Sequence, residues 1–289
     1  MAITCRHQLT IAVIGLLVGF PSLSIGAPIT FSASGANPAA IQGTVDSFRT
    51  TLGTLNANVA GSFSSGRREI NWDGVPDAFS ALNNLPANFF NINSPRGVVF
   101  STSGTGFQVS GNAGVAPVRF DNINVSYSSI FQTFSPQRLF TALGSNILDV
   151  NVFVPGSNTP ATVSGFGAVF TDVDLPNLTS IQYFDTNNAP LGTPFFVPTA
   201  NNGLSFLGVF FNAGERISRV RITNGNSILG PNDGIVDTPN VDVVVMDDFV
   251  YGEPQVVPEP TSLLLLGTGL AGLGVWRSRK RCFAIVQLP

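Results

Sequence analysis

The stretch Gly165-Phe166-Gly167-Ala168-Val169-Phe170-Thr171-Asp172-Val173-Asp174 lies in a run of apolar and β-branched residues that covers positions 161–173. This composition, after the loop sequence Pro155-Gly156-Ser157-Asn158-Thr159-Pro160, predicts a long β-strand. Gly165 and Gly167 inside it indicate a bulge or a place where another backbone packs closely. We therefore expect a fold built on β-strands around this segment.

Short strands are predicted on both sides of it. Residues 147–154 alternate between an apolar face and a mixed face, as in a half-buried strand. Turns rich in Gly, Asn and Pro separate further predicted strands at residues 67–72, 97–102, 106–110, 118–127, 180–184, 193–197, 204–211, 216–223 and 241–251. Ser103-Gly104-Thr105 looks like a hairpin connection. The regular spacing predicts an all-β sandwich or barrel.

One or two short helices are expected at the edge of this β fold. Ile41, Val45, Phe48 and Leu52 recur at helical spacing after Asn37-Pro38, a typical helix start, and Gly53 follows as a typical end. Residues 77–85 predict a second short helix that ends before Pro86.

The loop at residues 155–160 is a candidate boundary within the chain, either inside one sandwich or between two domains. Residues 28–159 hold six acidic residues and six arginines, whereas residues 160–257 hold ten acidic residues and three arginines. The absence of a basic patch argues against nucleic acid as a partner. The excess of acidic residues in the second half leaves cations as possible partners.

Residues 1–26 have the pattern of a secretory signal peptide. Arg6 and His7 are basic, residues 9–20 are apolar, and Ser24-Ile25-Gly26-Ala27 supplies the small residues of a cleavage site. We expect cleavage after Gly26, because a cut one residue later would leave Pro28 at the new terminus. The exported domain is then residues 27–256.

The C-terminal region has three consecutive parts. Val257-Pro258-Glu259-Pro260 is followed by an apolar, glycine-containing run at residues 261–276. At about 1.5 Å per residue, a helix of this length is shorter than the roughly 30 Å hydrocarbon core of a bilayer. The run predicts a weak transmembrane helix, and the cations that follow it place the C-terminus in the cytoplasm: Arg277, Arg279, Lys280 and Arg281.

This three-part order resembles the PEP-CTERM sorting signal of Gram-negative bacteria, over residues 257–281. The resemblance implies an exosortase substrate: a protein exported through the inner membrane, anchored there transiently, processed by a membrane peptidase and delivered to the cell surface or an extracellular matrix. It also implies that Val257, Pro258, Glu259 and Pro260 form the recognised motif. Residues 282–289 would be a short cytoplasmic tail beyond the signal.

A second, looser resemblance concerns the fold. The segment from Gly165 to Asp174, together with Met246-Asp247-Asp248-Phe249-Val250-Tyr251-Gly252, is similar to the jelly-roll β-sandwiches of exported PEP-CTERM proteins and carbohydrate-binding modules. The expected fold is therefore an all-β, jelly-roll-like sandwich.

Several kinds of chemistry lack their residues in the exported part. Cys5 and His7 leave with the signal peptide, and Cys282 lies beyond the basic cluster. Residues 27–256 therefore contain no cysteine or histidine for a disulfide, a nucleophilic triad or a zinc site of the usual kind. A carboxylate-dependent glycoside hydrolase remains an alternative, with candidates Glu69, Asp73, Asp77, Glu215 and Glu253.

Calcium is the cofactor that the acidic half favours, because this ion takes oxygen ligands from Asp and Asn. The candidate ligands are Asp172, Asp174, Asp247 and Asp248, the last pair by similarity to calcium-bearing jelly rolls. The loop at residues 232–237 is a further candidate, without the spacing of an EF-hand. The favoured interpretation of these residues is nevertheless that they fill turns through hydrogen bonds to nearby backbone.

Trp72 is the one tryptophan of the exported part, and it is either a core residue or an exposed platform for a sugar ring, with core burial favoured. Taken together, the sequence predicts a non-enzymatic surface or matrix protein with a structural or adhesive role in an exopolysaccharide layer. A calcium-assisted carbohydrate-binding module is the alternative.

Overall fold

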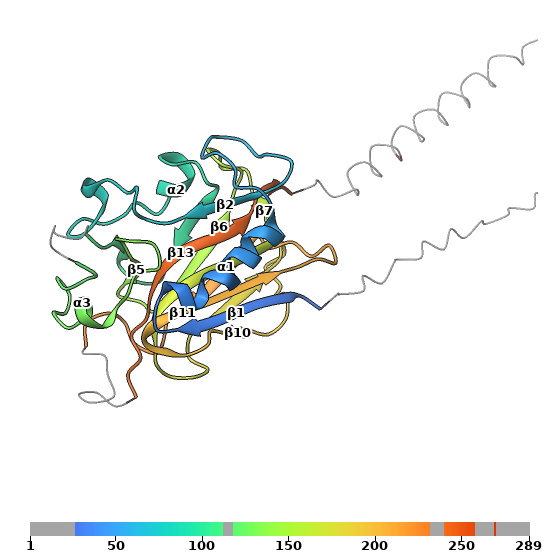
Figure 1. The fold of residues 1–289 in the computed structure, drawn as a ribbon. Helices are drawn as coiled ribbons and strands as arrows, with labels where there is room; N and C mark the ends of the chain where they lie inside the picture. The colour runs from blue at the N-terminus through green and yellow to red at the C-terminus, as the bar shows by residue number, and fades with distance from the viewer. Residues whose placement is uncertain (1–26, 112–117, 232–239, 258–268, 270–289) are drawn as a thin grey trace, which may run out of the picture.

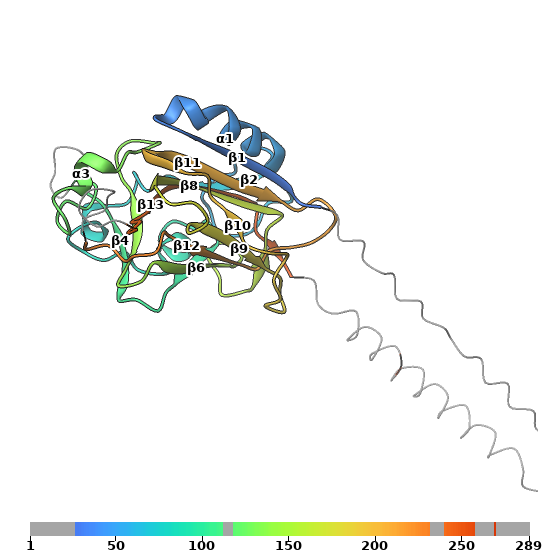
Figure 2. The ribbon, with the colours of Figure 1, turned by 90° about the horizontal axis from the view of Figure 1, so that it is seen from below.

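The computed structural model describes residues 27–111, 118–231, 240–257 and Gly269. The described part of the chain forms two antiparallel sheets that face each other, with a helix on the outside of one of them (Figures 1 and 2). The all-β sandwich expected from the sequence is confirmed. The predicted signal peptide, and the predicted membrane helix and tail apart from Val257 and Gly269, lie outside the described residues.

The larger sheet has seven strands in the order β1-β11-β8-β13-β5-β4, and β2 also pairs with β13. Its central strand, β8, is the segment from which the sequence predicted the fold. The strands of this sheet are β1 Ile29–Gly35, β2 Arg67–Ile70, β4 Gly106–Val109, β5 Phe140–Leu143, β8 Gly165–Val173, β11 Ala200–Phe210 and β13 Val245–Gly252.

The smaller sheet has five strands in the order β10-β9-β12-β6-β3. They are β3 Val98–Ser101, β6 Ile147–Val152, β9 Ser180–Phe184, β10 Phe195–Phe196 and β12 Arg219–Thr223. A two-stranded ribbon joins β7 Ala161–Thr162 to β14 Gln255–Val256. Strands from before and after residues 155–160 therefore pair within both large sheets.

Helix α1, Pro38–Leu52, covers the outer face of the larger sheet. It has the predicted bounds, and its buried residues are the predicted Ile41, Val45, Phe48 and Leu52. The N–H of Gly53 ends it by donating to the carbonyl of Arg49 at 3.1 Å, with the positive φ of 102° that glycine tolerates. The shorter helices are η1 Asp77–Phe79, α2 Phe89–Ile92 and α3 Tyr127–Ile130.

Strand β8 is buried along its whole length because it is covered on both faces. Phe166, Ala168 and Phe170 point into the space between the sheets, where they pack with residues of the smaller sheet. Val169 points the other way and packs under α1. Gly167 lies opposite Gly208 of β11. A β-carbon at Gly167 would stand only 2.8 Å from the Cα of Gly208, so close backbone packing explains this glycine.

Three local predictions were wrong. Residues 77–85 form only the three-residue helix η1, which turns and irregular chain follow, instead of one short helix. Strands β3 and β4 do not form a hairpin, because β3 pairs with β6 in the smaller sheet and β4 with β5 in the larger one. The turn between them crosses from sheet to sheet, and the N–H of Thr105 donates to the carbonyl of Leu143. Residues 118–126 form turns instead of a strand, with positive φ at Arg119 and Phe120. The N–H of Ser126 donates to the side-chain oxygen of Asn124.

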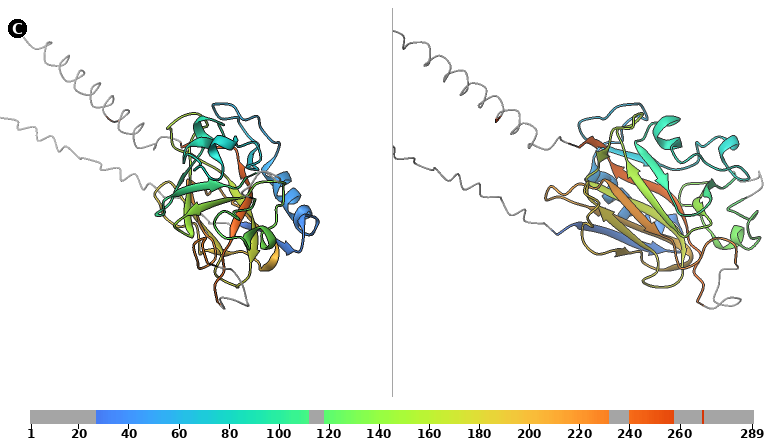
Figure 3. Two further views of the ribbon diagram at one scale, coloured as in Figure 1. Left: turned by 90° about the vertical axis from the view of Figure 1, so that its left-hand side faces the viewer. Right: turned by 180° about the vertical axis from the view of Figure 1, so that it is seen from behind.

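The chain enters and leaves the sandwich at the same end. Strand β1 begins, and strand β13 with its continuation β14 ends, on one side of the domain in every view (Figures 1 and 3). All described strands lie between Ile29 and Val256, so the described core is built within the predicted exported domain.

Candidate functional site

A polar pocket of about 510 Å³ opens beside α1, at the edge of the larger sheet. It combines side chains that are far apart in the chain. Helix α1 supplies Arg49, strand β2 supplies Glu69, the turn after β2 supplies Asn71, and strand β13 supplies Asp248. Arg96 and Ser135 also line it. We call the pocket lined by these six residues the polar pocket.

Arg49 organises this pocket. Its guanidinium donates to both carboxylate oxygens of Glu69 at 3.0 Å each, and to Asp248 at 3.3 Å. Burial lowers the pKa of Arg49, but the two carboxylates outweigh burial, so the pKa is raised overall. Because the bidentate geometry fixes both planes, Arg49 and Glu69 present a rigid polar wall.

A β-bulge places Asp247 next to Asp248, and Asp248 lines the polar pocket. Met246 pairs with Phe170 and Phe249 with Ala168, so the two acidic residues stand opposite a single residue of β8. Both are buried. The N–H of Phe134 donates to Asp247 at 2.6 Å, and the hydroxyl of Ser135 donates to Asp248 at 2.7 Å.

The electrostatics of this pair follow from its burial. Burial is the largest cause that raises the pKa of Asp248, to about 6, and Ser135, Asp247 and Arg49 oppose it. Burial also raises the pKa of Asp247 well above its usual value, and the charge of Asp248 adds to that effect. Asp73, which accepts from the N–H of Gln137 and Arg138, also has its pKa raised by burial. Burial therefore favours the protonated form of each of these three carboxyl groups.

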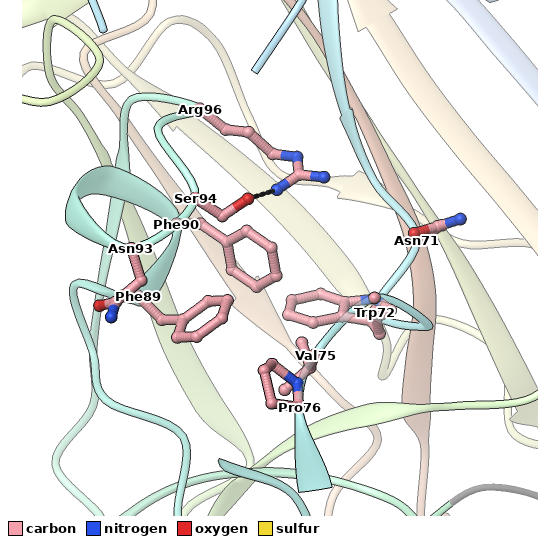
Figure 4. A pocket seen from close by; sticks show the side chains of 10 residues that line it. Asn71, Trp72, Val75, Pro76, Phe89, Phe90, Asn93, Ser94 and Arg96 are labelled. Atoms are coloured by element: carbon pink, nitrogen blue, oxygen red, sulfur yellow. Dashed lines mark hydrogen bonds between the residues drawn. The ribbon is translucent and has the colours of Figure 1, made fainter. Parts of the chain in front are cut away.

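A second, smaller pocket of about 210 Å³ shares Asn71 and Arg96 with the polar pocket. We call it the aromatic pocket, because Trp72, Phe89 and Phe90 converge on it (Figure 4). Arg96 lies over the ring of Phe90, 5.1 Å from its centroid, and donates to the carbonyl of Glu69 at 2.8 Å. Burial lowers the pKa of Arg96. Arg96 and Asn71 thus stand where polar and aromatic walls meet.

Trp72 is a core residue, which confirms the interpretation that the sequence favoured. Its side chain is 1% exposed, and it stacks on Phe140 with ring centroids 4.0 Å apart. Its indole N–H donates to the carbonyl of Asp247 at 2.9 Å. The alternative of an exposed sugar platform was wrong, because the turn after β2 folds the indole inward between the sheets.

The carboxylates considered for hydrolysis are held in different ways. Glu253 forms a fully buried bidentate pair with Arg68, at 2.7 and 2.8 Å. Asp77 pairs with Arg138 at 2.5 Å, and Glu69 pairs with Arg49. Asp73 accepts the two backbone N–H groups described above. Glu215 lies elsewhere, in an apolar pocket near the start of β1.

The four calcium candidates lie at two places. Asp172 ends β8 with a positive φ of 66° and accepts from the N–H of Asn202 at 2.6 Å. The backbone of Asp174 donates to Asp242. In the register of β8 and β13, Asp247 and Asp248 stand opposite Val169, about 10 Å along the strand from Asp172 at roughly 3.3 Å per residue. The two pairs of candidate ligands are thus not brought together.

Among the residues that the structure describes, no three acidic, histidine or cysteine side chains are grouped as they would be around a metal ion. The candidate loop at residues 232–237 lies outside the described residues. Calcium binding therefore stays a prediction.

The sorting motif continues directly from the last described strand. Val257 follows β14, whereas Pro258, Glu259, Pro260 and the basic residues Arg277, Arg279, Lys280 and Arg281 lie outside the described residues. Within the described part of the chain, no helix is long and apolar enough to cross a bilayer.

The described all-β domain is followed by the segment that the sequence predicts to be a C-terminal sorting signal. Residues 256–280 match the family model of the PEP-CTERM protein-sorting motif, so the chain carries that motif. The motif implies export and sorting to the surface of a Gram-negative bacterium, with processing by exosortase, a membrane protein. No curated protein and no solved structure matches the chain.

The sequence analysis did not single out Arg49, Arg96 or Ser135. Arg49 is separated from Asp248 by 199 residues, and no local pattern links the two. One feature of the sequence could have pointed to Arg49 as a site residue. It lies one residue after the buried Phe48 of an amphipathic helix, at the edge of the apolar face of that helix.

Proposed function

We propose that this chain is a non-enzymatic surface or matrix protein that the PEP-CTERM motif delivers to an exopolysaccharide layer, where it binds carbohydrate through the polar pocket. The export and sorting parts rest on the motif at residues 256–280. The binding part rests on the polar pocket itself.

One observation carries the binding proposal: fixed donors and acceptors line one open pocket. Arg49 and Arg96 donate, Glu69 and Asp248 accept, and Asn71 can do both. Sugar hydroxyls also donate and accept, so a pocket of this kind can satisfy them in pairs. Phe134, in the same lining, offers an apolar surface for a sugar face. Since the bonds of Arg49 are already formed, little order has to be gained on binding.

Asn71 is the residue that best separates binding from stability. It is exposed, its backbone carbonyl accepts from the N–H of Asp73, and the residue lines both pockets. The change Asn71→Ala should weaken glycan binding about three- to ten-fold, the loss of one neutral hydrogen bond, and leave the melting temperature unchanged. Asn187→Ala, on an exposed turn of the smaller sheet, is the matched control and should bind as the wild type does.

The measurement is a glycan array with the processed chain, followed by titration of the best glycan against wild type, N71A and N187A. Repeating it with and without calcium tests the calcium-assisted alternative, in which the metal would strengthen binding and raise the melting temperature. An array with no bound glycan, or equal affinity for all three proteins, would contradict the proposed pocket. Hydrolysis of a bound glycan would favour the hydrolase alternative.

A further inference from the structure

Glu215 is a half-buried acidic residue that lies outside the polar pocket. It follows the exposed turn at residues 212–214 and folds its carboxylate into an apolar pocket of about 440 Å³. Both carboxylate oxygens are buried, and neither has a hydrogen-bond partner among the residues that the structure describes. Burial of an unpaired carboxylate costs several kcal/mol, so this position calls for a cationic partner.

The walls of this pocket suit an ammonium ion. Phe195 and Phe211 contribute aromatic rings, whose faces attract cations. Pro190 and Leu191 add apolar contact, and Glu215 is the only residue among the described lining that titrates. A carboxylate beside aromatic rings is a setting in which a single ammonium group can form charge-assisted hydrogen bonds and contact the ring faces.

Pro28 also lines this pocket, and it stands at the predicted end of the signal peptide. The pairing of β1 and β11 explains why. Ile29 lies opposite Phe210, so the same antiparallel register sets Pro28 beside Phe211. Pro28, the residue directly before β1, therefore lies in the same pocket lining as Glu215. Ala27 is exposed and one residue from the pocket wall, about 3.8 Å from Pro28 between Cα atoms.

We propose that the Glu215 pocket binds the α-ammonium group of Ala27, which exists only after the signal peptide has been removed. Hydrolysis of the Gly26–Ala27 bond consumes one water, leaves a carboxylate on Gly26 and frees the nitrogen of Ala27, which takes up a proton. The three N–H donors of that ammonium reach both oxygens of Glu215. Removal of the signal peptide thereby completes the fold. The inference rests on the export included in the proposed function.

The ion pair between Ala27 and Glu215 would stabilise the edge of the larger sheet. Strand β1 is the outermost strand beside β11, and α1 follows it directly. Before cleavage the backbone nitrogen of Ala27 is an uncharged amide, and Glu215 has no cation to meet. After cleavage the charge holds the start of β1 against residues 211–215, so the mature protein should be more stable than its precursor.

The test compares chains that end at Pro289 and differ at their first residue, purified in uncharged detergent. One begins at Ala27 with a free ammonium, a second begins at Ala27 with an acetylated nitrogen, and a third begins at Ser24. The third keeps the positive charge but moves it about 10 Å away at roughly 3.4 Å per residue. Each is made with Glu215 and with the isosteric change Glu215→Gln.

The free Ala27 chain should melt about 3 °C above the acetylated chain and the Ser24 chain, since about 1 kcal/mol corresponds to 2–4 °C for a domain of this size. Glu215→Gln should abolish that difference, so that all three chains melt together. Equal melting temperatures of the three Glu215 chains, or differences that persist in E215Q, would overturn the proposal.

The pH dependence gives a second readout. An α-amino group in an unfolded chain titrates near pH ~7.7–8.0, and pairing with Glu215 raises its pKa in the folded state. The stabilisation is then complete below about pH 7.7 and is lost as the pH rises through the raised pKa. The difference in melting temperature between the free and acetylated Ala27 chains should therefore vanish as the pH rises. A difference that stays constant up to about pH 10.5 would contradict the assignment to an ammonium group.

Two controls separate this proposal from others. Methylammonium that raises the melting temperature of the free Ala27 chain through Glu215 would mean that the pocket is open for an external amine, and it would overturn the assignment to Ala27. Glycan binding should be the same in E215Q as in the wild type. Failure of the sorting or glycan experiments leaves these melting temperatures unaffected, because the chains are prepared with defined first residues.

Discussion

Single residues show how this sandwich places charge inside an apolar fold. Arg68 and Glu253 are both buried, and each is saturated with partners: Arg68 also donates to four backbone carbonyls, and Glu253 also accepts from Asn56 and the N–H of Phe63. Asp248 is also buried, but with fewer donors. The negative charge of Asp248 is therefore stabilised by fewer hydrogen bonds than that of Glu253. Burial accordingly raises the pKa of Asp248.

Asp248 gives a prediction for the pH dependence of stability. Its pKa is about 6 in the folded protein against 3.8 for an ordinary Asp, so the folded state holds the proton more tightly. The contribution of this group to stability is complete below pH 3.8 and is lost as the pH rises through 6. Asp248→Asn should remove that loss and stabilise the protein by about 1–3 kcal/mol at pH 8, given about 1.4 kcal/mol per pKa unit.

Chemical denaturation at a series of pH values from 4.5 to 8 measures the effect. The gain of D248N over wild type should grow through this range and level off above pH ~7. Asn71→Ala changes the same pocket without removing a titrating group, so it should follow the wild-type profile. A D248N protein that is less stable than wild type at pH 8 would show that the bond to Arg49 outweighs burial.

At the scale of elements, the contact between α1, β8 and β11 depends on glycine. Gly167 and Gly208 face each other across the β8–β11 ladder, and a β-carbon on Gly208 would press on the rings of Phe206 and Phe48 at 3.0–3.1 Å. The missing side chains leave the room that Phe48 of α1 fills. In contrast, a methyl group added at Gly43 of α1 would meet nothing within 4 Å, so no packing requires this glycine.

These two environments predict changes of opposite sign. Gly43→Ala should stabilise the protein by about 0.5–1 kcal/mol, because alanine lowers the entropy cost of the helix. Gly167→Ala should destabilise it by about 1–3 kcal/mol, because the clash is with backbone that cannot move aside. Urea denaturation of both variants beside wild type measures the pair. If Gly167→Ala left the free energy of unfolding unchanged, strands β8 and β11 would be able to move apart without loss of packing.

At the scale of the whole molecule, both ends of the described fold face the same side, where the sorting motif begins. Strand β14 pairs with β7 and so fixes the chain as far as Val256, one residue before the motif sequence starts. A peptidase at the membrane would therefore meet the motif at a defined distance from a folded domain.

The sorting motif predicts how processing fails. Changing Pro258 and Pro260 to Ala should leave the protein in its membrane-anchored form, because the motif that exosortase recognises is lost. Immunoblots of membrane and surface fractions measure this. Gln255→Ala lies just outside the matched residues 256–280 and should be processed normally. Unchanged processing of the double proline variant would refute recognition through these residues.

The sequence by itself determined the features that are written in consecutive residues: the sorting motif, helix α1 with its bounds, and most strands as separate segments. Local periodicity and short motifs are sufficient for these, because neighbouring residues in the chain carry the signal. Tertiary structure alone decided that β3 and β4 join different sheets, that a bulge places Asp247 beside Asp248, and that Arg49 contacts Asp248. These depend on strand register and long-range pairing, which are set by how the whole core packs and not by any one segment.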